Sequence, residues 1–229
     1  MVVQSPKKLI IFDLDGTLID SVPDLSVATN QMLATLGANA ADTEQVRTWV
    51  GNGSLKLTER ALAWAGLPTD MYALKQAHQL FLTAYQTHIK THKTCEYQGV
   101  SMGLDRLRQA GLILAIATNK PIAFVPEILT NMGWTDKFAC VLGGDSLPTK
   151  KPDPAPLLHI CNSLDIGTAQ AVMVGDSVND IQASKSAGMT ALALSYGYNY
   201  GKPIADSNPD AVFDEFGVLV DFILQNLVK

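Results

Sequence analysis

The sequence has few charged residues and no long run of basic or apolar residues. Charged residues make up 17% of the 229 residues, below the ~25% that is usual for globular domains. The net charge is −5, and the chain has no basic stripe of the kind that nucleic-acid binding requires. We therefore expect no nucleic-acid partner, and an anionic substrate would need local positive charge.

Cysteine is also scarce. Cys95, Cys140 and Cys161 lie far apart and form no CxxC pair, which favours reduced thiols over a disulfide framework and predicts a cytoplasmic location. No segment reaches the ~18 apolar residues that a membrane-spanning helix needs. The apolar run 9–12 is too short for a signal sequence, so we expect neither export nor membrane insertion.

Short apolar runs that end in polar residues or glycine recur along the chain, and such runs are typical of buried parallel strands. Helical patterns separate the later runs. The sequence therefore predicts an α/β fold, with a doubly wound, Rossmann-like parallel sheet. The predicted strands are 9–12, 112–117, 141–142, 171–174 and 191–194, and the helices between them are 122–132, 156–164 and 178–187.

Residues 21–92 interrupt this alternation, because their apolar positions have helical spacing and include no convincing strand. Three helices are expected here, at 21–36 with Ser21 as the N-cap, at 55–65 and at 71–88. We therefore predict two domains. Residues 1–20 and 93–229 would form an α/β core, and residues 21–92 would form an inserted all-helical cap.

The clearest chemical signal is the pair Asp13 and Asp15, which directly follows the first predicted strand. Ligands of open α/β sheets bind beyond the carboxyl ends of the strands, and alternation along extended backbone places both carboxylates on one face. Adjacent carboxylates repel one another unless a cation lies between them. The structural alternative is a turn that merely ends the strand. A calcium EF-hand is excluded, because Leu18 and Asp24 stand where that loop needs glycine and glutamate.

Two further motifs could bind an anion. Thr118 and Asn119 follow a strand and precede a helix N-terminus, where they could bind phosphate oxygens or simply cap the helix. Lys151 offers a point charge, and Pro152 restricts it to extended backbone. Lys150 competes for this role, and both lysines could equally be solvated.

A third carboxylate, Asp176, follows the strand 171–174 and is the natural third metal contact. Ser177 and Asp180 have capping-box spacing, so we expect Asp180 to lie behind the metal ligands. His88 and His92 are four residues apart, but no glutamate completes an HExxH motif. We therefore do not expect zinc there.

These four motifs, in this order, resemble those of the haloacid dehalogenase superfamily over essentially the whole chain. Within it, the segments 51–53, 143–145 and 196–199 resemble the bacterial phosphoglycolate phosphatases. The resemblance implies a magnesium-dependent phosphatase with Mg²⁺ as the cofactor. The implied partner is a small phosphorylated metabolite, with 2-phosphoglycolate favoured.

The resemblance also implies roles for the acidic residues. Asp13 would be the nucleophile that forms an aspartyl phosphate, and Asp15 would act first as an acid and then as a base. Asp13, the backbone carbonyl of Asp15, and Asp176 would bind the metal through hard oxygen ligands.

The other implied roles concern the substrate. Thr118, Asn119 and Lys151 would surround the transferring phosphoryl group, and the charge of Lys151 would take part in catalysis. The cap would close over the site and recognise the organic part of the substrate. Asn52 and its flanking glycines are the expected contact.

Several alternatives stay open, because core motifs do not distinguish substrates. The chain could be a phosphatase or mutase for another small metabolite such as a sugar phosphate. Asp15 argues against a dehalogenase, which needs no acid two residues after the nucleophile. A phosphonatase would use a cap lysine as a Schiff-base amine, and Lys56 could serve or could be a solvated helix residue. A non-catalytic, phosphate-binding regulatory protein would be expected to have lost at least one motif, and none is lost.

Overall fold

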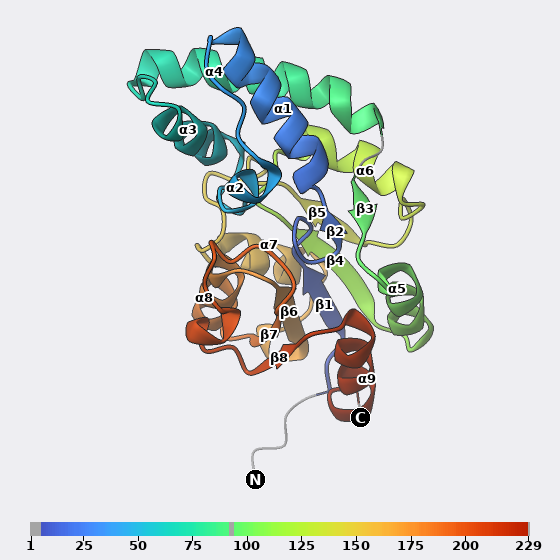
Figure 1. The fold of residues 1–229 in the computed structure, drawn as a ribbon. Helices are drawn as coiled ribbons and strands as arrows, with labels where there is room; N and C mark the ends of the chain where they lie inside the picture. The colour runs from blue at the N-terminus through green and yellow to red at the C-terminus, as the bar shows by residue number, and fades with distance from the viewer. Residues whose placement is uncertain (1–5, 92–93, 229) are drawn as a thin grey trace.

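The computed structural model describes residues 6–91 and 94–228. Within these residues a parallel sheet of six strands has the order β5-β4-β1-β6-β7-β8 (Figure 1). This order confirms the predicted doubly wound α/β fold. The strands are β1 Leu9–Phe12, β4 Ile113–Ala117, β5 Cys140–Leu142, β6 Ala171–Gly175, β7 Thr190–Leu194 and β8 Ala211–Phe213.

Strand β1 lies in the middle of the sheet and is completely buried. Burial of both faces explains why its sequence is uniformly apolar rather than alternating. Its last residue, Phe12, is in register with Ile116 of β4 and Val174 of β6. The residues that follow these three strands therefore emerge side by side at one edge of the sheet.

Helices cover both faces of the sheet (Figure 1). The Ile10 and Phe12 face packs in one apolar cluster with α5 Val100–Gln109 and α9 Phe216–Asn226. The Leu9 and Ile11 face packs in another with α7 Ala155–Ser163 and α8 Val178–Ser186. The predicted helix 122–132 is instead a 3₁₀ turn, Ile122–Phe124, followed by α6 Val125–Asn131. Pro126 in the first turn of α6 has no N–H, and the start of a helix tolerates this.

Four helices lie beyond the carboxyl ends of the strands (Figure 1): α1 Val22–Thr35, α2 Thr43–Arg47, α3 Ser54–Trp64 and α4 Met71–His88. We call this group the helical cap. Its entry and exit meet in a short antiparallel pair of β2 Ile19–Asp20 and β3 Cys95–Glu96. The division into a core of 1–20 and 93–229 and a cap of 21–92 stays a prediction, and residues 92–93 lie outside the described residues.

The helices α1, α3 and α4 begin and end close to the predicted positions, whereas α2 was not predicted. Ser21 stands at the N-cap position of α1, as predicted. The Ser21 side chain makes no cap hydrogen bond to α1. Instead, Asp20 Oδ1 accepts a hydrogen bond from the Val22 N–H at 3.1 Å. At α4, Asp70 Oδ1 accepts from the N–H groups of Tyr72 and Ala73, which fixes the start of the longest cap helix. No helix in the described part of the chain is long and apolar enough to cross a membrane.

Candidate active site

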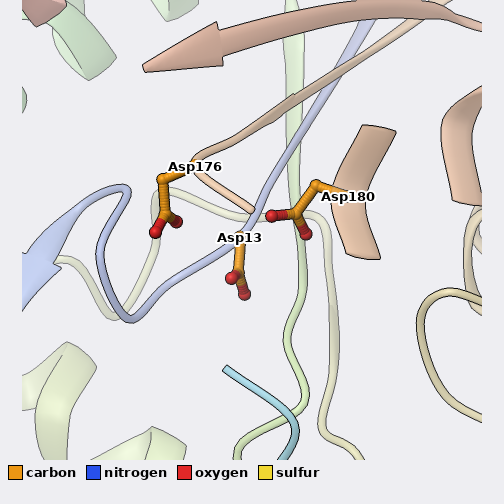
Figure 2. Close-up of side chains that lie close together, drawn as sticks. All are labelled: Asp13, Asp176 and Asp180. Atoms are coloured by element: carbon orange, nitrogen blue, oxygen red, sulfur yellow. The ribbon is translucent and has the colours of Figure 1, made fainter. Parts of the chain in front are cut away.

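Three buried carboxylates face one another at the carboxyl edge of the sheet (Figure 2). Asp13 directly follows β1, Asp176 directly follows β6, and Asp180 lies in the first turn of α8. One oxygen atom of each lies within 4.8 Å of those of the other two. We call this group the carboxylate cluster. Like charges so close repel one another strongly unless positive charge lies among them.

Lys151 supplies one positive charge to the cluster. Its Nζ lies 3.0 Å from Asp13 Oδ1 and donates a hydrogen bond to Asp180 Oδ1 at 2.6 Å. Burial disfavours the charged form of this lysine, yet Asp13 and Asp180 raise its pKa above the ordinary value. Lys150, the competing candidate, instead donates to the backbone carbonyl of Asn52 at 2.8 Å.

Asp180 connects Lys151 to the start of α8. Its Oδ2 accepts hydrogen bonds from the N–H and the hydroxyl of Ser177 at 3.0 and 2.7 Å, so the predicted capping box is present. Asp176 is also held at both oxygens. It accepts from the Thr17 hydroxyl and from the Tyr198 N–H, each at 2.6 Å. These bonds fix the two side chains in their orientations.

The cluster still has more negative than positive charge. Burial raises the pKa of Asp13 to about 6, although Lys151 opposes this shift. Burial, together with Asp180 and Asp13, raises the pKa of Asp176 well above its ordinary value. Asp13 Oδ1 is fully buried and, despite its ion pair with Lys151, accepts no hydrogen bond of good geometry. Both features fit the binding of a hard divalent cation such as Mg²⁺.

Gly16 leaves space for the Asp176 carboxylate. Its φ of +91° is one that side-chain-bearing residues rarely adopt, and a Cβ atom there would overlap the Asp176 carboxylate. Asp13 and Asp176 are therefore well placed as metal ligands, and Asp180 lies closer to them than the sequence suggested. Metal binding by Asp13, Asp176 and the backbone carbonyl of Asp15 stays a prediction.

The Asp15 side chain has a partner that sequence reasoning missed. Lys120 Nζ donates to both Asp15 oxygens, at 2.9 and 3.1 Å, and the two side chains are 3% and 12% exposed. The same ammonium lies 4.8 Å from the centre of the Tyr85 ring. The only signal in the sequence was that Lys120 directly follows Thr118 and Asn119 after strand β4.

Thr118 and Asn119 lie at the site, as expected from the sequence, but the Asn119 side chain is already engaged. Its Nδ2 donates to the backbone carbonyls of Gly51 at 3.1 Å and Lys151 at 2.9 Å. Asn119 thus joins a cap loop to the segment that carries the cluster lysine. Direct contact of Thr118, Asn119 and Lys151 with the phosphoryl group stays a prediction.

The cap loop Gly51–Gly53 meets the core through several hydrogen bonds. Asn179 in α8 donates to the Gly51 carbonyl at 3.2 Å and to Tyr200 Oη at 2.7 Å. Asn52 accepts from Arg60 Nη2 at 2.6 Å and donates to Asn179 Oδ1 at 3.4 Å. Asn52 therefore takes part in the cap-to-core contact, and its contact with substrate stays a prediction.

A narrow pocket lies between the cap and the strand ends, with a volume of about 40 Å³. That volume admits only a few water-sized groups, since one water molecule needs a cavity of roughly 10–15 Å³. Polar groups of the core and apolar side chains of the cap line it together. Its described lining comprises Asp13, Asp15, Leu25, Val50, Gly51, Gly53, Ser54, Leu57, Phe81, Tyr85, Thr118, Asn119, Lys120, Pro121 and Phe124.

Two other candidates lie away from this pocket. Lys56 forms an ion pair with Glu59 at 2.6 Å on the surface of α3 and is not among the described lining residues. His88 Nε2 lies 2.7 Å from Gln31 Oε1. Its companion, His92, lies outside the described residues, so the structure does not test a zinc pair there.

The sequence and the fold are both similar to those of known proteins. Residues 10–194 match the model of the haloacid dehalogenase-like hydrolases. The chain is 54% identical over 223 residues to a phosphoglycolate phosphatase from Psychrobacter arcticus, with 96% of each chain covered. It is 45% identical to one from Vibrio cholerae, with 95% of this chain and 97% of the relative covered.

Among solved structures, a predicted phosphoglycolate phosphatase from Haemophilus somnus has a TM-score of 0.90 and 40% identity, with 95% of this chain and 98% of that chain covered. The match to the family model spans the strands that carry Asp13, Thr118 and Asp176. The chain therefore belongs to the haloacid dehalogenase-like hydrolase family.

Proposed function

We propose that this protein is a phosphatase that hydrolyses 2-phosphoglycolate to glycolate and inorganic phosphate. The observation that carries the proposal is the buried carboxylate cluster with its lysine, at the strand ends of a chain whose relatives over nearly the full length are named phosphoglycolate phosphatases. A phosphoryl group needs both a nucleophile and neutralising charge, and the cluster offers both.

In the first step a carboxylate oxygen of Asp13 attacks phosphorus. A bond forms between this oxygen and phosphorus, and the bond between phosphorus and the ester oxygen breaks. Asp15 gives a proton to the departing oxygen, which leaves as the hydroxyl of glycolate. Lys151, 3.0 Å from Asp13, offsets the negative charge that gathers around phosphorus.

In the second step a water molecule attacks the phosphorus of the aspartyl phosphate. Asp15, now a carboxylate, takes the proton of this water. The bond between phosphorus and the Asp13 oxygen breaks, inorganic phosphate forms, and the Asp13 carboxylate is restored. Asp15 lies two residues from the nucleophile on the same strand end, so one residue can serve both steps.

Magnesium is proposed as the cofactor, held by Asp13, the carbonyl of Asp15, and Asp176. When bound, it would neutralise charge between the anionic nucleophile and the anionic substrate. The buried Asp13 oxygen that accepts no hydrogen bond of good geometry and the raised pKa of Asp176 support this assignment. A cytoplasmic location is also proposed, and the three free cysteines Cys95, Cys140 and Cys161 accord with it.

The test is phosphate release from a panel of phosphomonoesters, compared by kcat/KM with magnesium and with a chelator. We expect 2-phosphoglycolate to rank first, turnover to need magnesium, and Asp13→Asn to lose it. A sugar phosphate that ranked well above 2-phosphoglycolate would assign the protein to the alternative substrate class. Full turnover by Asp13→Asn would contradict the mechanism.

A further inference from the structure

The pocket beside Asp13 has one cation among its described lining residues, which is Lys120. The neighbouring basic groups are not among these lining residues. Lys151 contacts Asp13 and Asp180, Lys150 donates to the Asn52 carbonyl, and Arg60 donates to Trp49 and Asn52. A substrate anion other than the phosphoryl group would therefore meet Lys120.

The Lys120 ammonium can accept such an anion without leaving its place. An ammonium carries three N–H donors, and the hydrogen bonds of this one go to a single carboxylate, Asp15. The Tyr85 ring covers another side of it. Its side chain is only 3% exposed, so water screens its charge weakly.

The rest of the pocket wall is mostly apolar, formed by Leu25, Val50, Leu57, Phe81 and Phe124. A carboxylate that entered such a wall without a charged partner would be unfavourable, because burial removes its hydration. The small volume of about 40 Å³ also limits the organic part of the substrate. Both features favour a short substrate whose second anion lies next to Lys120.

We propose that Lys120 determines specificity by pairing with the carboxylate of a short phosphorylated acid. This proposal rests on the proposed function above and deepens it, because it names the group that distinguishes such acids from neutral phosphate esters. A site that pairs with a charged group discriminates strongly against an analogue that lacks it. The hydrogen bonds to Asp15 then hold the Lys120 ammonium at the pocket wall.

The experiment compares two esters of equal carbon number, 2-phosphoglycolate and 2-hydroxyethyl phosphate, which differ in having a carboxylate or a CH₂OH group. The measured quantity is the ratio of their kcat/KM values. We expect Lys120→Met to lower this ratio by at least about 30-fold, the lower end for loss of a buried charged partner. Lys120→Arg should keep most of the preference, and Lys185→Met, on the exposed side of α8, should not change it.

The ratio separates specificity from a merely structural role. Loss of the Asp15 contact lowers turnover of both esters alike, so an unchanged ratio in Lys120→Met would overturn the proposal. If that variant does not fold, as judged by its thermal melt, Lys120→Gln keeps donors without charge and should show the same fall in the ratio. A wild-type enzyme without preference for 2-phosphoglycolate would contradict the proposed function itself, whatever the variants do.

Discussion

Asn179 donates a hydrogen bond to the backbone carbonyl of Gly51 at 3.2 Å, which joins the first turn of α8 to the cap loop. The same carbonyl accepts from Asn119 at 3.1 Å. The loop that follows β4 and the first turn of α8 therefore both bind one carbonyl of the cap loop. The position of the cap and the placement of these two segments are thus physically connected.

We expect Asn179→Ala to lower kcat/KM for 2-phosphoglycolate by up to about tenfold. The variant loses the hydrogen bonds that the Asn179 side chain makes with Gly51, Tyr200 and Asn52, and one hydrogen bond of this kind contributes about 0.5–1.5 kcal/mol. Steady-state kinetics measure the effect. Asn162→Ala, at an exposed position of α7, is the matched control, and equal kinetics in the two variants would count against a role for the cap contact.

Asp180→Asn should lower kcat by about 10- to 100-fold. Lys151 would lose its charged hydrogen-bond partner, which is worth about 1.5–3 kcal/mol, and would shift relative to Asp13. Ser177→Ala removes only the hydroxyl bond to Asp180 and should cost about 1 kcal/mol of stability with little change in kcat. If both variants lost kcat equally, the helix start rather than the lysine would be the cause.

The pH dependence of the metal-free protein should show the raised pKa of Asp13. The folded pKa of about 6 exceeds the ordinary aspartate pKa of 3.8, so the folded state binds more protons between these two pH values. The contribution of Asp13 to the free energy of unfolding is therefore largest below about pH 4. It falls as the pH rises towards 6, by on the order of 3 kcal/mol. Chemical denaturation across this range measures it.

Asp13→Asn cannot lose a proton from its side chain and provides the control. The variant should lack this part of the fall in stability. Magnesium should also remove it from the wild-type protein, because a bound cation favours the ionised carboxylate. Parallel pH profiles for wild type and Asp13→Asn without metal would show that the folded pKa of Asp13 is not raised.

Gly16→Ala should weaken magnesium binding as well as the fold. The new methyl group would overlap the Asp176 carboxylate, and the backbone would be strained at a φ of +91°. Gly37→Ala separates these effects, because Gly37 has a φ of +75° with no atom within 4 Å of the new Cβ. Gly37→Ala should lower the free energy of unfolding by about 1–2 kcal/mol. Calorimetric titration with magnesium should show weaker binding for Gly16→Ala alone.

The parts of the fold that could be predicted are those with a local signal. The strands β1, β4, β6 and β7 are buried apolar runs, and Asp70 and the helical spacing that follows it mark α4. Strand β8 was missed because it is a short edge strand of three residues, and α2 because it has only five. Neither is long enough to show a period.

The residues of the site also fall into those with a local sequence signal and those without one. Motifs at strand ends predicted that Asp13, Thr118 and Asp176 would lie close together, because the edge of a parallel sheet brings distant strand ends together. Lys151 lies in a loop and was predicted from its charge and the proline that follows it. The pairing of Lys120 with Asp15 spans 105 residues and has no local pattern. Ser21 shows a different limit, because it stands at the predicted N-cap position of α1 but its side chain makes no cap hydrogen bond.

Ile19 pairs with Glu96 and Asp20 with Cys95, and this short antiparallel pair brings the entry and the exit of the helical cap together. A segment that leaves and returns at one place can be lengthened, shortened or exchanged during evolution without altering the register of the central sheet. The reaction and the choice of substrate can then diversify separately. One hydrolytic centre could thus be inherited unchanged by descendants that act on quite different metabolites.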